Sequence, residues 1–188
     1  PVVSGYDSSV VDTSDPAVLL DALGRPVTAD EVSQIAPWRF RAPLSPDLAA
    51  AREGRHIDFD ELVKFSRAAI DGAKGPLFIE GVGGIMVPLD GQRTVLDWMS
   101  ALDIPLLLVV GGYLGTISHT LTALDVIAQR KLSIAAIVVS ESERDTVELA
   151  DTVASITRFA GSVGVVGLPR LPAGIKHHPA VAKIASLL

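Results

Sequence analysis

A glutamate followed by a glycine-rich turn is the first feature of the sequence that could carry chemistry. Glu80 follows the apolar run 77–79 and precedes Gly81-Val82-Gly83-Gly84. A carboxylate at the end of a buried strand can hold Mg²⁺ beside the phosphates of a nucleotide, and glycines let backbone N–H groups approach an anionic ligand closely. The alternative is a solvated glutamate before an ordinary tight turn, and the pattern leaves both interpretations open.

A second segment, residues 109–119, joins a predicted strand to a predicted helix and ends in Leu-Gly-Thr-Ile-Ser-His. The N-terminus of a helix can bind an anion or a polar substrate through its unpaired N–H groups. The segment is not a phosphate loop, because it lacks the Gly-Lys-Ser/Thr ending. His119 has no Cys, His or acidic neighbour at metal-ligand spacing, and a lone histidine there is more often structural than catalytic.

Two further polar residues are weaker candidates. Ser4 follows the short apolar run 2–3, and a serine at a strand end can bind a carboxylate. Asp15 could ligate a metal, but it also stands in the first turn of a predicted helix, where negative charge is favoured in any case.

Short apolar runs and longer helical patterns alternate along the chain and must position these residues. The predicted strands, buried on both faces, are residues 2–3, 77–79, 105–110, 134–139 and 163–168. A first predicted helix starts at residues 14–16. Five further helices are predicted at residues 45–52, 58–74, 116–130, 144–160 and 180–188. This alternation predicts an α/β fold, a doubly wound and mostly parallel sheet flanked by helices in a single domain, with ligands beyond the carboxyl ends of the strands.

Composition excludes several classes of function. The chain has 188 residues, 48% of them hydrophobic, a net charge of −6 and no cysteine. Disulfides and Cys-based zinc sites are therefore ruled out, and no basic patch suits nucleic acid or an anionic membrane. The longest apolar run, residues 104–110, is far shorter than the roughly 20 residues that span a bilayer. We expect a cytoplasmic protein with no nucleic-acid or membrane partner.

Several motifs, in this order, resemble the dethiobiotin synthetase family over roughly residues 1–171. They are Pro-Val-Val-Ser-Gly at residues 1–5, Ser14-Asp15, Trp-Arg-Phe-Arg-Ala-Pro-Leu-Ser-Pro at residues 38–46, Ala-Arg-Glu-Gly-Arg at residues 51–55, residues 80–84 with Val87-Pro88-Leu89, and residues 109–122. The Ser-Pro block and the Leu-Gly-Thr-Ile-x-His-Thr block are the most specific of these.

The resemblance implies a phosphate-loop NTPase-like fold and a ligase of biotin synthesis that uses ATP and Mg²⁺. One amine of 7,8-diaminopelargonic acid takes up CO₂ as a carbamate, ATP phosphorylates the carbamate, and the second amine closes the ureido ring. The partners implied are these small molecules and a second copy of the chain, because family members are homodimers with the substrate at the subunit interface.

The same resemblance implies roles for particular residues. The metal ligands implied are Asp15 and Glu80. The substrate-binding residues implied are Ser4, Gly115, Thr116 and Ser118. The nucleotide-binding residues implied are Asp15, Glu80, Gly81, Val82, Gly83, Ser140, Glu141, Pro169, Arg170 and Leu171. Family members often carry an asparagine after the strand at 134–139 to bind adenine, and Ser140-Glu141 in its place predicts weak recognition of the base.

The family pattern also contains a unit that residues 1–188 do not carry. It is a strand, a loop ending Gly-Lys-Thr and a helix, followed by a catalytic lysine that we expect immediately before Pro1. Residues 1–188 would then be one α/β ligase domain without that unit. Two alternatives remain: an inactive relative that serves as a binding or structural module, and another phosphate-loop ligase with a fused glutaminase, for which the chain has no Cys nucleophile.

Overall fold

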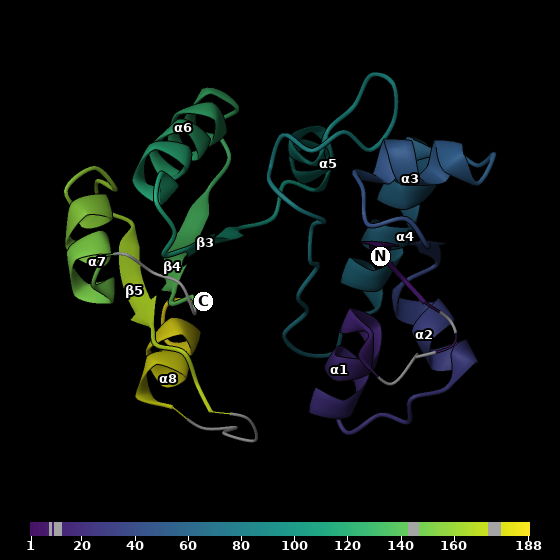
Figure 1. The fold of residues 1–188 in the computed structure, drawn as a ribbon, viewed down its shortest axis with the longest axis horizontal. Coiled ribbons are helices and arrows are strands. Elements are labelled where there is room, and N and C mark those ends of the chain that lie inside the picture. Colours follow the sequence, from purple (N-terminus) through teal and green to yellow (C-terminus); the bar gives the residue numbers. More distant parts are fainter. Residues whose placement is uncertain (8, 10–12, 143–146, 173–177) are drawn as a thin grey trace. The chain divides into compact units, whose positions relative to one another are not determined.

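Strands and helices alternate along the chain and divide into two units, residues Pro1–Leu102 and Asp103–Leu188. The computed structural model describes residues 1–7, 9, 13–142, 147–172 and 178–188. Each unit holds a parallel sheet. Figure 1 shows the sheet of the Asp103–Leu188 unit and the helices of both units. The prediction of an α/β fold with parallel strands flanked by helices is confirmed.

The Pro1–Leu102 unit holds a two-stranded parallel sheet, β1 (Val2–Ser4) beside β2 (Trp38–Phe40), with Val3 opposite Arg39. Its helices are α1 (Asp15–Ala22), α2 (Ala29–Ile35), α3 (Pro46–Arg52), α4 (Phe59–Gly72) and α5 (Val95–Leu102). Proline opens α1 and α3 as expected, because its missing N–H is not needed at the first turn. At the start of α4 the Asp58 carboxylate accepts the N–H groups of residues 60 and 61.

Helices α2 and α5 were not predicted, although each has a start signal. The Thr28 side chain accepts from the Glu31 N–H, and Asp97 Oδ2 accepts from Thr94 N at 2.8 Å and from Thr94 Oγ1 at 2.9 Å. A buried hydrogen bond then joins α5 to α4, because Trp98 Nε1 donates to Ser66 Oγ at 3.2 Å. These contacts place Trp98, only 2% exposed, in the core of this unit.

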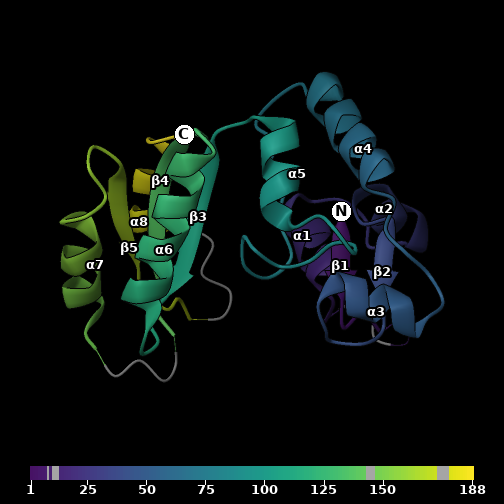
Figure 2. The same cartoon turned by 90° about the horizontal axis from the view of Figure 1, so that it is seen from above.

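The Asp103–Leu188 unit is a three-stranded parallel sheet in the order β3 (Leu106–Gly111), β4 (Ile134–Ser140), β5 (Gly164–Leu168). Helices α6 (Thr116–Gln129) and α7 (Leu149–Thr157) pack on one face around buried Ile137, Val139 and Ile156. Helix α8 (Pro179–Ala185) leads Leu187 onto the opposite face, against Gly164. Figure 2 shows α6 alongside the strands.

The predicted strand at residues 77–79 is wrong. This run lies outside every strand, and Leu77 and Phe78 are 43% and 68% exposed. An apolar run becomes a buried strand only when a neighbouring strand pairs with its N–H and C=O groups, and no described residue pairs with it. Glu80 therefore does not end a buried strand, and the described strands form two separate parallel sheets.

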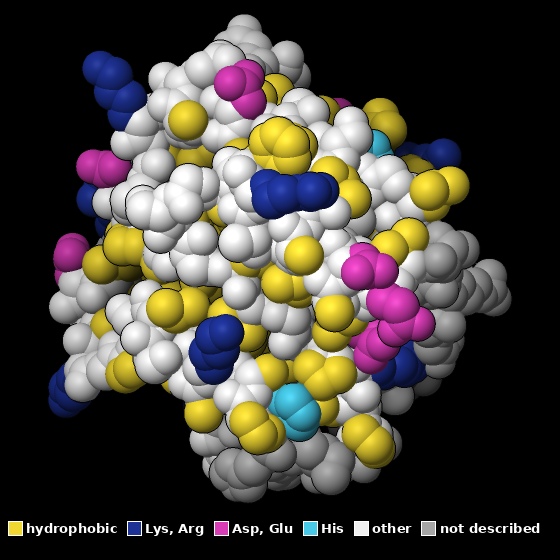
Figure 3. All heavy atoms as spheres, turned by 90° about the vertical axis from the view of Figure 1, so that its left-hand side faces the viewer, with side chains coloured by type: hydrophobic (Ala, Val, Ile, Leu, Met, Phe, Trp, Pro, Cys, Tyr) yellow, Lys and Arg dark blue, Asp and Glu magenta, His cyan; other side chains and the backbone are white. Residues whose placement is uncertain are grey.

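The remaining predicted elements are close to those observed. The helix expected at 144–160 is seen from Leu149 to Thr157, and residues 144–146 lie outside the described part of the chain. Among the described residues, no helix is both long and apolar enough to cross a membrane. On the face drawn in Figure 3, the Lys and Arg side chains of described residues are scattered and do not gather into a basic patch.

Candidate functional site

Three groups of predicted site residues meet at one edge of the β3-β4-β5 sheet. The register pairs Gly111 with Ser140 and Ser140 with Leu168, so the loops after these three strands start side by side. The loop after β3 leads to Gly115, Thr116 and Ser118, and the loop after β5 contains residues 169–171. Because this is the carboxyl edge of a parallel sheet, the residues lie where ligands bind in α/β folds.

A carboxylate ties two of these loops together. Glu141 Oε2 accepts from the backbone N–H of Arg170 at 2.8 Å, and the N–H of Glu141 donates to the carbonyl of Leu168 at 2.9 Å. The predicted base-binding residues after β4 and β5 are thus in direct contact. The contact also occupies one oxygen of Glu141, so this side chain fixes the shape of the loop.

The turn before α6 is tied back to the end of β3. Thr116 Oγ1 donates to the carbonyl of Gly111 at 2.6 Å, and the N–H of Thr116 donates to the carbonyl of Tyr113 at 3.0 Å. Gly115 has a φ of +98°, in the left-handed region that favours glycine. The turn holds Leu114 out at its tip, 84% exposed, and places the first N–H groups of α6 beside the glycine.

Two side chains close this turn on its outer side. Tyr113 Oη and His119 Nδ1 share a hydrogen bond of 3.0 Å, and their ring centroids are 5.7 Å apart. The sequence singled out His119 without a partner and did not single out Tyr113 at all. The six-residue spacing crosses from a turn into a helix, so neither helical nor strand periodicity pairs the two residues.

In the Pro1–Leu102 unit, Ser4 ends β1 and is held by the motif at residues 38–46. The N–H of Gly5 donates to the carbonyl of Ala42 at 3.1 Å, and that of Tyr6 donates to the carbonyl of Phe40 at 2.9 Å. A Cβ on Gly5 would lie 3.3 Å from the Cβ of Pro43. The two sequence motifs therefore meet in space and fix the backbone on both sides of Ser4.

The turn after Glu80 needs glycine for steric reasons. Gly83 has a φ of +70°, and a Cβ there would lie 2.9 Å from Val87 Cγ2. A Cβ on Gly81 would lie 3.2 Å from Val95 Cγ1, at the start of α5. The turn is therefore packed against the segment that leads into α5, where the N–H of Val95 donates to the carbonyl of Val87.

Glu80 itself is exposed. Asp15 is also exposed, in the first turn of α1. Among the described residues, neither carboxylate accepts a hydrogen bond from the protein.

These two carboxylates fit the ligand preference of Mg²⁺. Within the described residues, no group of three or more His, Cys, Asp or Glu side chains could hold a metal ion. A protein cage of many ligands is therefore not available there. Mg²⁺ commonly uses one or two carboxylates and completes its shell with water and substrate phosphates, so the exposed carboxylate of Asp15 or of Glu80 has the ligand chemistry that this ion prefers.

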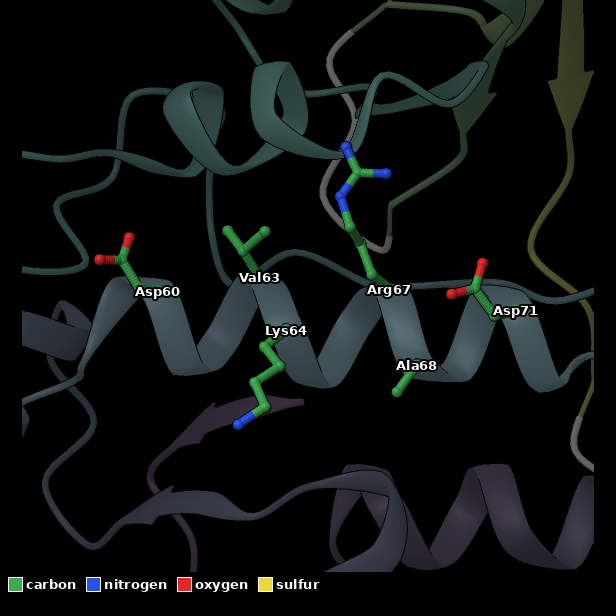
Figure 4. A pocket seen from close by; sticks show the side chains of 6 residues that line it. All are labelled: Asp60, Val63, Lys64, Arg67, Ala68 and Asp71. Carbon is green, nitrogen blue, oxygen red and sulfur yellow. The ribbon is translucent and has the colours of Figure 1, made fainter.

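A hollow along α4 is not the predicted site. Figure 4 shows its lining, which comes from one face of the helix: Asp60, Val63, Lys64, Arg67, Ala68 and Asp71. None of the predicted site residues is among them. The guanidinium of Arg67 donates to the carbonyl of Ala101, and Asp60 pairs with Arg93 at 3.4 Å. Arg67 and Asp60 thus already have partners in the protein, and Lys64 pairs with Glu61 at 3.5 Å.

Comparisons with known proteins agree on one group of relatives. A family model described as an AAA domain matches residues 3–177. The chain is 51% identical over 163 residues to ATP-dependent dethiobiotin synthetase BioD of Acidiphilium cryptum strain JF-5, covering 86% of this chain and 73% of that protein. It is 48% identical over 171 residues to the protein of the same name in Caulobacter vibrioides strain NA1000 / CB15N, and the alignment covers 90% of this chain and 76% of that protein. The protein of the same name in Phenylobacterium zucineum strain HLK1 is 44% identical over 172 residues, and the alignment covers 90% of this chain and 74% of that protein.

Proposed function

Because this chain belongs to the dethiobiotin synthetase family, we propose that it closes the ureido ring of dethiobiotin from 7,8-diaminopelargonic acid, CO₂ and ATP. The observation that carries the proposal is the 51% identity to the Acidiphilium cryptum enzyme over 86% of the chain. The family match at residues 3–177 includes each residue that the sequence predicted for the site. We place the reaction in the cytoplasm, where ATP is made available to biosynthetic enzymes.

The reaction has three steps. One amine of the substrate attacks CO₂ and loses a proton, which gives a carbamate. A carbamate oxygen attacks the γ-phosphorus of ATP and releases ADP. The second amine then attacks the carbamate carbon, so that the C–N bond of the ring forms as the C–O bond to phosphate breaks and inorganic phosphate leaves. Such chemistry depends on positioning and on neutralisation of phosphate charge.

Asp15 and Glu80 are the residues that would hold Mg²⁺. When bound, the metal supplies positive charge to the phosphates during transfer. The exposed carboxylates of both residues are open to water and to a phosphate ligand. The packed glycine turn after Glu80 offers its N–H groups to the same ligand, which supports a nucleotide-proximal role for Gly81, Val82 and Gly83.

The sheet edge of the Asp103–Leu188 unit supports roles in binding both substrates. Ser140, Glu141 and residues 169–171 form one connected surface for the nucleotide. Gly115, Thr116 and Ser118 present backbone and hydroxyl groups at the start of α6, suited to a carboxylate or other polar group of diaminopelargonate. Ser4 would bind the same substrate, and we propose a homodimer in which the α6 turn serves the site of the other subunit.

Growth without biotin tests the proposal in cells. The host is a bacterium that lacks its own dethiobiotin synthetase. The complete reading frame is expressed in it, because residues 1–188 contain no Gly-x-x-x-x-Gly-Lys-Ser/Thr motif. We expect growth without added biotin, as the same cells show when dethiobiotin is supplied. Growth only when dethiobiotin is supplied would refute the activity and favour a role as a binding module.

A further inference from the structure

We propose that Tyr113 and His119 form a positioning pair that holds the turn before α6 in the shape that binds diaminopelargonate. The inference rests on the proposed function, which assigns this turn to the substrate. Neither residue is proposed to touch the reacting atoms. Their role is to fix Gly115 and the first N–H groups of α6 through the hydrogen bond that joins them.

The turn cannot hold its own shape, because glycine supplies three of its residues. Gly111, Gly112 and Gly115 fall within five positions, and glycine has more backbone freedom than any other residue. Gly115 also adopts a φ of +98°. A segment of this kind has many alternative conformations, so that external contacts must select the one seen here.

The inner side of the turn is fixed by contacts of Thr116. Its hydroxyl donates to the carbonyl of Gly111 at 2.6 Å and its N–H donates to the carbonyl of Tyr113 at 3.0 Å. Thr116 is only 3% exposed, so these bonds are shielded from water. They anchor the end of β3 to the first residue of α6 and leave the exposed outer side of the turn to be held by something else.

The Tyr113–His119 hydrogen bond holds that outer side. His119 is fixed by the helix, because its N–H donates to the carbonyl of Gly115 at 3.1 Å. Its Nδ1 meets Tyr113 Oη at 3.0 Å. The tyrosine is thus linked to a rigid element across Gly115, and the four-residue connection between β3 and α6 is closed on both sides.

Gly111 makes room for this pair. A Cβ on Gly111 would lie 3.1 Å from Cδ1 of the Tyr113 ring, so a side chain at residue 111 would displace the ring by a few tenths of an ångström from its place against the end of β3. A Cβ on Gly115 would lie in ordinary van der Waals contact with Cε1 of His119, at 3.8 Å, so Gly111 and not Gly115 makes room for the pair. The ring positions are therefore matched to the backbone beneath them, as expected for a contact that determines the shape of the turn.

The nucleotide loops have a separate support. Glu141 links the loops after β4 and β5 through the N–H of Arg170, and this bond involves neither Tyr113 nor His119. Loss of the Tyr113–His119 hydrogen bond should therefore weaken binding of diaminopelargonate and leave binding of ATP unchanged. A general loss of stability would affect both substrates together, which separates positioning from a merely structural role.

Steady-state kinetics of four variants test the pair. We expect Tyr113→Phe, which removes only the hydroxyl, to raise KM for diaminopelargonate about three- to tenfold with kcat within about twofold, as for the loss of one hydrogen bond. His119→Leu should give the same change, and the double variant should be no worse than either single one, because the two act as one unit. His119→Asn keeps a polar side-chain atom near Nδ1 and should restore most of the affinity.

A histidine far from the turn serves as the control. His56 is exposed in the loop after α3, and His56→Leu should leave both KM values unchanged. Equal changes in the two KM values, additive effects in the double variant, or a KM for diaminopelargonate unchanged in Tyr113→Phe would overturn the proposal. Failure of the proposed function can be told apart from failure of this inference. In the first case the wild-type protein itself forms no dethiobiotin.

Discussion

At the scale of single residues, the acidic side chains of this protein fall into two kinds. Glu53 and Glu141 accept hydrogen bonds from backbone N–H groups of Arg41 and Arg170. Asp15 and Glu80 are exposed and accept no hydrogen bond from any described residue. The first kind stabilises loops, and the second kind is available to a ligand, which suits the metal role that the family resemblance implies for Asp15 and Glu80.

The carboxylate charge of Glu80 is predicted to be essential for turnover. Glu80→Gln should lower kcat at least about a hundredfold, in line with the several kcal/mol that a catalytic metal supplies. The melting temperature should be unchanged, because the side chain is exposed. Glu61→Gln, an exposed change on α4, is the matched control and should keep full activity. Near-normal turnover of Glu80→Gln at ordinary Mg²⁺ would show that Glu80 is only a solvated turn residue.

Recognition of the base is predicted to be weak. Ser140 has one hydroxyl where an asparagine would offer one acceptor and two donors, and one oxygen of Glu141 is already engaged by Arg170. GTP and CTP should support ring closure with kcat/KM within about tenfold of ATP, a difference of roughly 1.4 kcal/mol. Ser140→Asn should widen the gap in favour of ATP. A wild-type preference for ATP above about a thousandfold would mean that another residue reads the base.

At the scale of elements, the sequence predicted what local patterns determine and missed what neighbours determine. The β-branched run of β4 is buried on both faces and that of β5 is partly buried, and their composition alone identified both strands. The run at 77–79 has the same composition, but a strand also requires a partner strand, which composition does not provide. Helix α2 was missed although Thr28 and Glu31 form a start signal.

Contacts between distant segments set the limit for the site as well. The sequence identified Ser4 and the motif at residues 38–46 separately, and their hydrogen bonds appear only in the fold. It placed Gly115 at a helix start correctly, but the pairing of Tyr113 with His119 follows from the exact path of the turn. The parallel pairing of β4 with β5 places Ser140 beside Leu168. Parallel topology therefore accounts for the part of the site at the ends of these strands, which could be predicted.

The glycine turn after Glu80 allows a test of steric need. Gly83→Ala combines a left-handed φ with a Cβ contact of 2.9 Å, and should lower the free energy of unfolding by about 1–3 kcal/mol. Gly84→Ala is the control, because no atom lies within 4 Å of its Cβ position and its φ is not positive. Denaturant unfolding of both variants measures the difference. Equal stability of the two would show that the turn adjusts without strain.

Glu53 should make stability depend on pH. The hydrogen bond from the Arg41 N–H, aided by Arg55, lowers the pKa of this carboxyl from its ordinary value of 4.5. Its contribution is therefore complete above the unfolded value and is lost as the pH falls through the lower folded value. The difference in melting temperature between the wild type and Glu53→Gln should be largest at neutral pH and shrink under acid conditions. A difference that is constant with pH would contradict this assignment.

At the scale of the whole molecule, one family match spans two compact units. It covers residues 3–177, whereas the units divide after Leu102. The Pro1–Leu102 unit carries the predicted metal ligands and Ser4, and the Asp103–Leu188 unit carries the predicted base-binding loops and the α6 turn. A single α/β ligase domain over residues 1–188 stays a prediction, as does the homodimer, which light scattering of the purified protein measures.

Ring closure by the purified product of the complete reading frame tests the central claim most directly. The protein is incubated with diaminopelargonate, ATP, Mg²⁺ and ¹³C-bicarbonate, and the products are analysed by mass spectrometry. We predict dethiobiotin with the label in the ureido carbon, and one ADP and one phosphate released for each ring formed. Absence of labelled dethiobiotin, with ATP left intact or hydrolysed independently of diaminopelargonate, would contradict the account.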